Sequence, residues 1–351
     1  MDDGLAQDSS APLSERDFAL INCLEVSPRA TWRQIGEVLD LDPVTVARRW
    51  QRLERSGAAW VTGRPAARFA PGACLAVLEV RCSAGAVADV WRALAARPHV
   101  LSVEHTSGDW DLTATLALPS AAELSRYLER VVGRVAGVSE VRSQLVTRVH
   151  TEGDLWQLRV LDADQRRALA VPAVAAGTRR ARTSGPDAAD RRLILALGRN
   201  GRAPLSALAA ETGLAVSTVG RRIAALLERE ELSLRCDVAT PLSGWPVSAW
   251  VWARTAPDDT ATPAALVRRL PGLRVCLRLS GGSANLLLGL SARSLVELPV
   301  VEAELARAAP GLTVLREAMV LRFVKRMGRL LDERGHSCGA VPMDVWSDLS
   351  S

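Results

Sequence analysis

The sequence is poor in the residues that build metal sites, disulfide frameworks and catalytic centres. Its six cysteines are scattered, with no Cys-x-x-Cys pair and no histidine cluster nearby, so we expect buried, reduced thiols. The four histidines, His99, His105, His150 and His336, are isolated along the chain. No glycine-rich phosphate loop and no nucleophile elbow is present. These absences argue against an enzyme, and they predict no catalytic residues, no metal and no cofactor.

Long apolar runs and a strong excess of charge are also missing. No stretch approaches the ~20 consecutive apolar residues of a membrane helix, and residues 1–10 are acidic and polar, unlike a signal peptide. We therefore expect a cytoplasmic protein with no membrane partner. The net charge of +5 is mild, which fits local contact with nucleic acid but not a wholly cationic surface. Arginine carries nearly all of the positive charge, because Lys325 is the only lysine.

The chain does contain enough length and apolar material for several packed domains. Its 351 residues, 48% of them hydrophobic, predict two to four domains. Residues 13–69 are predicted to form the first, with three short helices and then a small strand or wing. Ser14 with Asp17, and Thr31 with Gln34, have the spacing of capping boxes that begin the first two helices.

The third helix of this domain has its start and stop signals in the sequence. Asp42 suits the N-cap, Pro43 the first helical position, and Gly57 the left-handed residue that ends a helix. Residues at i, i+4 and i+7 form an apolar seam, namely Val46, Trp50 and Leu53. The other side carries hydroxyl and guanidinium groups, from Thr45, Arg48, Arg49 and Arg52.

A helix held by one face and offering such groups on the other suits the major groove of DNA. We therefore predict a helix-turn-helix domain whose third helix contacts double-stranded DNA. The alternative is an ordinary solvated helix face, which arginine-bearing helices usually present. Arg49 lies beside the seam, so phosphate contact or structural pairing is favoured there over reading of bases.

Residues 72–152 change to a pattern of alternating strands and helices. The order βαββαβ predicts a ferredoxin-like, ACT-like sandwich in which helices cover an antiparallel sheet, so the fold class is α+β. A tight turn, residues 108–111 (Gly-Asp-Trp-Asp), joins the two middle strands. The turn is either a small-molecule contact or a plain β-turn whose aspartate bonds its own backbone.

The whole arrangement then recurs, which indicates a tandem duplication. Asp190 follows Asp17 at an offset of 173 residues, and this offset holds without a gap through the third helix. The repeat predicts a linker over 173–186, a second helix-turn-helix domain over 187–240 and a second sandwich over 245–327. Residues 328–351 are left as a polar tail with one apolar patch and no assigned role.

Over residues 13–152 and 186–327, the chain resembles the Lrp/AsnC family of bacterial transcription regulators. The residues that carry the resemblance are the helix from Thr45 to Gly57 and the Gly-x-x-Asp turn within a βαββαβ unit. The resemblance implies DNA-binding domains joined to sandwich domains, which the family calls RAM domains. Those domains are implied to sense a small effector, typically an amino acid, and to form oligomers. The implied effector contacts are Gly108, Asp109, Trp110, Asp111, Gly282, Ser283 and Asn285.

This chain departs from the family in carrying two diverged copies of a unit that is usually single. The second recognition helix presents Ser217, Thr218, Arg221 and Arg222, but Arg52 is replaced by Ala225. Asp111 is replaced by Asn285, which cannot supply a charge to an ammonium group. One of the two copies therefore either still binds its ligand in an altered way or has lost that function. We expect a covalent pseudo-dimer that prefers an imperfect palindrome and forms homo-oligomers through its sandwich domains.

We therefore expect a sequence-specific regulator whose DNA affinity responds to an effector. Two alternatives remain at this stage. Siroheme decarboxylases have a similar architecture, but neither half contains the histidine-rich motif that would support such chemistry. The other alternative is an interaction scaffold whose helix-turn-helix units no longer bind DNA.

Overall fold

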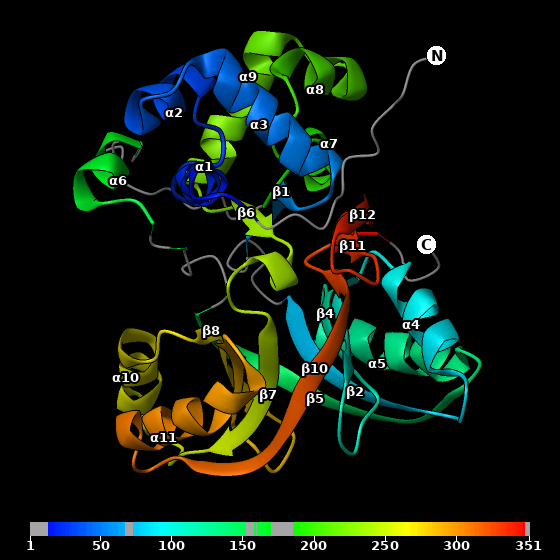
Figure 1. The fold of residues 1–351 in the computed structure, drawn as a ribbon. Helices are drawn as coiled ribbons and strands as arrows, with labels where there is room; N and C mark the ends of the chain where they lie inside the picture. The colour runs from blue at the N-terminus through cyan, green and yellow to red at the C-terminus, as the bar shows by residue number, and fades with distance from the viewer. Residues whose placement is uncertain (1–12, 67–72, 152–157, 159, 170–184, 348–351) are drawn as a thin grey trace, which may run out of the picture.

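The computed structural model describes residues 13–66, 73–151, 158, 160–169 and 185–347. Two helix-turn-helix units lie together on one side of a large sheet, and pairs of helices cover the sheet on opposite flanks (Figure 1). The mixed α/β architecture and its internal repeat confirm the predicted fold class. No helix of the described residues is long and apolar enough to cross a membrane.

The helices of the two helix-turn-helix units begin where the capping residues predict. Both capping boxes of the first unit are present, and Asp42 accepts hydrogen bonds from the first turn of the third helix. In the second unit Asp187 and Asp190 form a capping box, whereas the third helix begins after Ala215 without a side-chain cap. The helices are α1 (Glu15–Val26), α2 (Trp32–Leu39), α3 (Pro43–Arg55), α7 (Ala188–Arg199), α8 (Leu205–Thr212) and α9 (Val216–Glu228).

The small strand or wing predicted after the third helix is a strand, and it has a partner in the other half of the chain. Strand β1 (Ala59–Pro65) pairs antiparallel with β6 (Leu232–Val238), which is its counterpart in the second unit. One face of this two-stranded ribbon packs on the helices through Val61 and Cys236. Of the two alternatives, a small strand or a wing, the structure shows the strand; a short strand leaves its backbone groups unpaired, and the duplicated strand satisfies them. Residues 67–69 of the predicted segment lie outside the described residues.

Two arginines, one from each helix-turn-helix unit, bind the other unit, and we call these reciprocal contacts of Arg29 and Arg202 the clasp. Arg29 donates to the carbonyl oxygens of Gly201 and Ala203, at 2.7 and 3.0 Å. Its counterpart Arg202 donates to the carbonyl oxygens of Pro28 and Ala30, at 2.7 and 2.9 Å. The contacts are reciprocal under the internal repeat, so the two units dock as the halves of a symmetric dimer do.

Each predicted sandwich domain is present with its βαββαβ order. The helices of each domain cover one side of its strands, burying Leu78 and Leu116 in the first domain and Val251 and Leu288 in the second. The first domain consists of β2 (Cys74–Cys82), α4 (Val87–Ala95), β3 (Val100–Thr106), β4 (Leu112–Leu118), α5 (Ala121–Arg130) and β5 (Val138–Thr151). The second consists of β7 (Val247–Arg254), α10 (Ala261–Arg269), β8 (Leu273–Ser280), β9 (Leu286–Ala292), α11 (Leu298–Ala308) and β10 (Thr313–Arg326).

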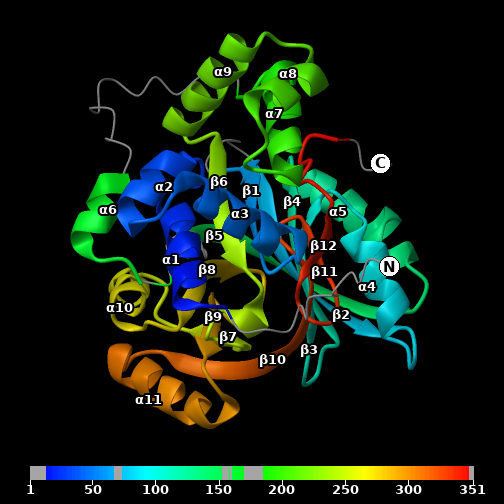
Figure 2. The same ribbon diagram turned by 45° about the horizontal axis from the view of Figure 1, so that its top comes forward.

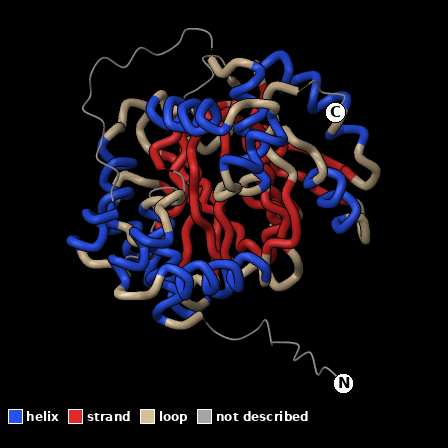
Figure 3. Tube along the Cα trace, turned by 90° about the horizontal axis from the view of Figure 1, so that it is seen from above, coloured by secondary structure: helices blue, strands red, loops and turns tan. Residues whose placement is uncertain are grey.

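The two domains share their longest strands and thereby form one sheet. β5 and β10 each have 14 residues, and each pairs with its own domain along one part and with the other domain along the rest. The order β10-β3-β4-β2-β5-β8-β9-β7 returns to β10, so the strands close into a ring, which Figure 3 shows from above. The sandwich domains therefore pair edge to edge within one chain.

The end of the chain, where the sequence suggested only a polar tail, is also folded. β11 (Arg329–Leu331) and β12 (Ser337–Ala340) form a hairpin that extends the sheet from β10. Figure 2 shows this hairpin next to the helix-turn-helix layer. Met343 and Val345 are buried, and Trp346 packs against the core of the second helix-turn-helix unit. The predicted tail is thus a connector between the two layers.

The stretch between the halves is only partly described. Helix α6 (Ala163–Leu169), which the sequence analysis did not predict, packs on the first helix-turn-helix unit through Leu169. The side chain of Asn22, which is fully buried, accepts hydrogen bonds from the backbone N–H groups of Val160 and Leu161. Of the predicted linker, residues 173–184 lie outside the described residues.

Candidate functional site

The predicted recognition helix α3 is anchored by one face and exposed on the other. Val46, Trp50 and Leu53 are buried in the core of the first unit, as their spacing predicts. Arg48 is exposed and Thr45 is half-buried, so both lie on the open side of the helix. The arrangement leaves a hydroxyl and a guanidinium group accessible on one short, rigid element.

The other two arginines of α3 share a partner within the protein. Asp17, the buried capping residue of α1, accepts from Nη1 of Arg49 at 3.2 Å and from Nη2 of Arg52 at 2.8 Å. The side chain of Arg49 is mostly buried, which matches the structural pairing favoured for it. The side chain of Arg52 is 52% exposed, so its remaining N–H groups still face solvent. Asp17 therefore orients both guanidinium groups.

The second recognition helix α9 repeats this geometry with a stronger ion pair. Ser217 and Arg221 are exposed and Thr218 is half-buried, while the apolar seam that holds the helix is buried. Nη1 of Arg222 contacts Asp187 and Asp190, at 2.9 and 2.7 Å. Hydrogen bonds to these carboxylates raise the pKa of Arg222. Hydrogen bonds from the Asp190 backbone and from Arg222 lower that of Asp187.

The first predicted effector turn is braced by the sheet beside it. Oδ2 of Asp111 accepts from the backbone N–H of Cys82 at 2.7 Å, and the guanidinium of Arg81 donates to the carbonyl of Asp109. Trp110 is 3% exposed and lies between two guanidinium groups, those of Arg81 and Arg142, at 4.8 and 4.9 Å from its ring. Gly108 has a φ of +90°, which this turn requires and which glycine adopts readily.

The second turn repeats these contacts with an amide in place of the carboxylate. Asn285 accepts from the backbone N–H of Thr255 and donates to its carbonyl, at 3.0 and 2.8 Å. Arg254 donates to the carbonyl of Ser283, as Arg81 does in the first turn. A Cβ on Gly282 would lie 2.2 Å from Nε2 of Gln144, so a larger residue there would require the Gln144 side chain to move. Both turns thus use Asp or Asn to hold the end of a neighbouring strand.

Each turn lies at the seam between the two sandwich domains. In the first turn, the N–H of Ser107 donates to the carbonyl of Met319 on β10, at 2.9 Å. In the second, Gln144 on β5 donates to the carbonyl of Ala284, at 3.4 Å. The turn of each half therefore contacts the long strand of the other half. A compound bound at a turn would touch both domains.

Sequence reasoning missed a group of buried charges between the helix-turn-helix layer and the sheet. The carboxyl of Glu104 on β3 is one of them, and its burial raises its pKa to about 8, opposed in part by the charge of Arg326. An unfolded glutamate titrates near 4.5. Between these pH values the unfolded chain releases a proton that the folded chain keeps, so this group makes stability fall as pH rises. No sequence signal places Glu104 beside Arg326, because β3 and β10 belong to different halves.

Replacing Glu104 with glutamine is expected to remove this pH dependence. Glutamine stays neutral at every pH, so E104Q should match the unmodified chain near pH 4.5 and be more stable at pH 8. Urea midpoints of both proteins at pH 5 and pH 8 measure the difference. A stability gap that stays constant across this range, or one that favours the unmodified chain at pH 8, would contradict the assignment.

The histidines do not come together. His99 is buried, and its Nε2 lies 3.0 Å from the carbonyl oxygen of Ser347; burial lowers its pKa. The ring of His105 lies 5.5 Å from that of Trp91 and is tilted against it, and His150 lines a cavity between the β1–β6 ribbon and the ring of strands. Within the described ranges no group of three or more His, Cys, Asp or Glu side chains is arranged to hold a metal ion.

Comparison with known proteins finds two kinds of domain in the chain. An AsnC-type helix-turn-helix domain matches residues 13–54 and again 187–227, and an Lrp/AsnC ligand binding domain matches residues 75–155. The HTH-type transcriptional regulator FL11 of Pyrococcus horikoshii is 29% identical over 145 residues, covering 40% of this chain and 93% of that relative. The FL11 protein of Pyrococcus furiosus is 28% identical over 144 residues, again 40% of this chain and 93% of the relative.

The duplicated arrangement also occurs in a solved structure. The siroheme decarboxylase NirDL, in complex with an iron-uroporphyrin III analogue, is similar over 90% of this chain and 93% of its own, with a TM-score of 0.59 and 15% sequence identity. NirDL without that compound has a TM-score of 0.57 at the same identity. At this level of identity the likeness shows a shared fold.

Proposed function

We propose that this chain, whose helix-turn-helix and ligand binding domains match those of the Lrp/AsnC family of transcriptional regulators, binds an operator through two recognition helices carried by one polypeptide. The observation that supports this is the clasp of Arg29 and Arg202 together with the β1–β6 ribbon, which hold α3 and α9 in one rigid pair. A regulator of this kind acts where its DNA is, in the cytoplasm.

The two recognition helices expose different side chains, so α3 and α9 are expected to bind different half-sites of the operator. We assign Arg48 and Arg221 to contacts with base edges, because a guanidinium group can bind guanine through two hydrogen bonds. We assign contacts with phosphates or bases to three hydroxyl groups, those of Thr45, Ser217 and Thr218. Arg52 contributes to the first half-site only, since the second helix has Ala225 there, whereas Arg49 and Arg222 brace the helices. The operator is therefore an imperfect palindrome.

Effector control is assigned to the two turns at the seam. Asp111 and the buried Trp110 form the first site, with Gly108 and Asp109 completing the turn. Gly282, Ser283 and Asn285 form the second, which lacks a carboxylate. An amino acid bound at the first site would place its ammonium group near Asp111. Homo-oligomers are proposed here as the regulator's assembled state.

Replacing Arg48 with alanine is expected to weaken operator binding about 5- to 150-fold, which corresponds to the ~1–3 kcal/mol of one bidentate base contact. R221A should weaken binding by a similar factor, and its effect should map to the other half-site. Selection of bound sites from random duplex DNA by the purified chain provides the operator. Titration of that duplex at fixed salt concentration then measures both variants.

Arg130→Ala is the matched control, because it removes one exposed guanidinium from α5 on the far layer. Its affinity should equal that of the unmodified chain. If R48A and R221A bind the selected duplex as well as this control does, the two helices are not the readers and the scaffold alternative gains support. Release of CO2 from added siroheme by the purified chain would instead support the enzyme alternative.

A further inference from the structure

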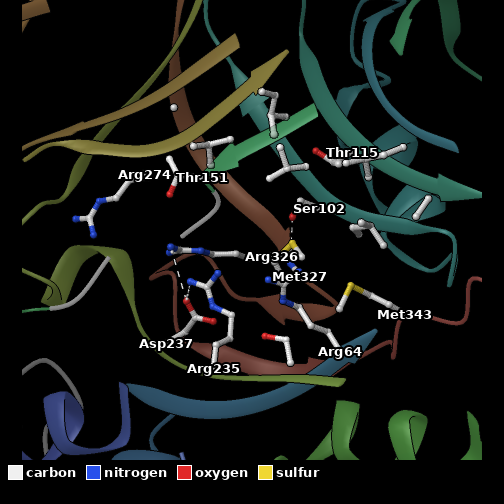
Figure 4. Close-up of a pocket in the computed structure, with 18 of the residues that line it drawn as sticks. Arg64, Ser102, Thr115, Thr151, Arg235, Asp237, Arg274, Arg326, Met327 and Met343 are labelled. Carbon is white, nitrogen blue, oxygen red and sulfur yellow. Dashed lines mark hydrogen bonds and ion pairs between the residues drawn. The ribbon is translucent and has the colours of Figure 1, made fainter. Parts of the chain in front are cut away.

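A cavity of about 1110 Å³ lies between the β1–β6 ribbon and the ring of strands (Figure 4). It is separate from both seam turns, none of whose predicted effector residues lines it. Ligand pockets for drug-sized compounds typically measure ~300–1,000 Å³. The space is therefore much larger than one amino acid requires.

Positive charge dominates the walls of this cavity. Guanidinium groups enter it from the ribbon and from three strands of the ring, namely Arg64, Arg235, Arg148, Arg274 and Arg326. Asp237 pairs with Arg235, and its carboxylate lies 3.8 Å from Arg326 (Figure 4). The carboxyl groups of Glu104 and Glu25 also line the space, but burial raises their pKa values to about 8 and about 7. Glu230 also lines the cavity, and burial lowers the pKa of Arg274 to about 8. The walls therefore carry five arginines against four acidic side chains, two of which have raised pKa values.

Several buried polar atoms at this cavity have no protein partner. Among the described residues, none makes a hydrogen bond with Nε1 of Trp250, Nε2 of His150 or Oε2 of Glu104. Each of these three residues lines the cavity. A buried polar atom without a partner costs ~1–3 kcal/mol. A ligand with oxygen atoms would recover part of that cost.

The remaining walls are apolar and partly aromatic. Trp245 and Phe323 contribute rings, and Met327, Met343 and Leu277 contribute aliphatic surface. Methionine side chains adapt to ligands of different outline. The cavity therefore combines an apolar body with cationic ends, which matches an amphipathic anion.

The duplication has made this cavity asymmetric. Thr62 faces Arg235 across the ribbon, and these two positions correspond under the internal repeat. Asp237 corresponds in the same way to Arg64. In a dimer of identical chains both halves would carry the same residue at each position. A single chain with two copies can carry an arginine in one half and a carboxylate at the matching position of the other half, so the two halves of the cavity differ in charge.

We propose that this cavity is a second ligand site, which takes a small molecule with an anionic group on an apolar body. The anionic group is a carboxylate or a phosphate, and it lies near Arg326. The apolar body lies between the ribbon and the strands. Such a ligand would contact the ribbon that joins the two helix-turn-helix units, but the proposal concerns binding alone and does not depend on DNA recognition.

The test uses two fluorescent probes that differ in charge. 1-Anilinonaphthalene-8-sulfonate carries an anionic group, and N-phenyl-1-naphthylamine has the same rings without it. We expect saturable binding of the sulfonate at one site per chain, at least tenfold tighter than binding of the uncharged probe. Displacement by 2-naphthoate and by 2-naphthyl phosphate then distinguishes a carboxylate ligand from a phosphate ligand.

Variants locate the binding in the cavity. R326M should weaken binding of the sulfonate at least tenfold while leaving the uncharged probe unchanged, and T115W should fill the space and abolish binding of both. R148A, at an exposed edge of the cavity, should weaken the sulfonate alone and keeps the test valid if R326M does not fold. Arg130→Ala should change nothing. Sulfonate binding that survives R148A and T115W, or that matches binding of the uncharged probe, would overturn the proposal and leave the DNA-binding function untouched.

Discussion

Replacing Trp50 with alanine is expected to unfold the first helix-turn-helix unit while the second stays folded. Trp50 is 2% exposed and lies at the centre of a core that includes Ile21, Leu24 and Ile35. Removing a buried tryptophan side chain costs ~3–5 kcal/mol through lost burial and the cavity left behind. A loss of this size is comparable to the stability of a small domain. Operator binding through α3 should be lost with it.

Hydrogen exchange of the backbone amides measures this loss unit by unit. Exchange should speed up by two orders of magnitude or more in α1, α2 and α3, and change little in α7, α8 and α9. Ile223→Ala, at the equivalent position of α9, is the matched control, and its faster exchange should be confined to the second unit. Equal acceleration in both units after W50A would show that they unfold only together.

Replacing Arg202 with alanine is expected to loosen the docking of the two helix-turn-helix units. The side chain donates two hydrogen bonds to backbone carbonyls and stacks on Trp32, with its guanidinium carbon 3.8 Å from the ring centroid. Hydrogen bonds from a charged donor contribute ~1.5–3 kcal/mol each, and the two carbonyls would lose their partner. We expect a loss of about 2–4 kcal/mol in stability, by the same principle. Operator affinity should also fall at least tenfold, because the spacing of α3 and α9 would no longer be held.

The structure offers two controls for the clasp. R202K keeps the charge but cannot make the paired bonds, so it should lose most of the stability that R202A loses. Arg33→Ala removes an exposed guanidinium from the same pair of units, and it should leave the urea midpoint and operator affinity nearly unchanged. If R202K behaves like the unmodified chain, charge rather than the paired geometry holds the units together. R29A should repeat the effects of R202A, since the contacts are reciprocal.

The local elements of this protein follow from the sequence because their causes are local. Ser14, Thr31 and Asp42 cap helices through neighbours two or three residues away. The burial of Val46, Trp50 and Leu53 follows from helical periodicity alone. The internal repeat and the family also follow from the sequence, since both depend on residue identity and spacing. The exposure of Arg48 and Arg221 is the part of the proposed DNA interface that could be predicted in this way.

The assembly of these elements was decided by contacts between distant parts of the chain. The sequence contains two long strand patterns, but nothing in it says that half of β5 pairs with β8, or that half of β10 pairs with β3. Arg29 and Arg202 lie in loops, where no periodicity marks their targets 172 to 174 residues away. The C-terminal hairpin is short, and Met343, which follows it, is buried only because the end of the chain packs between the sheet and the helix-turn-helix layer.

The cavity was hidden for the same reason. Its cations come from β1, β5, β6, β8 and β10, and in the sequence each is one arginine among many. A helix or strand depends on hydrogen bonds and side chains within a few residues, so sequence alone determined the elements and their repetition. A cavity and a clasp depend on which surfaces meet after folding. Only the tertiary structure therefore placed the charges that now face one another across the pseudo-dimer.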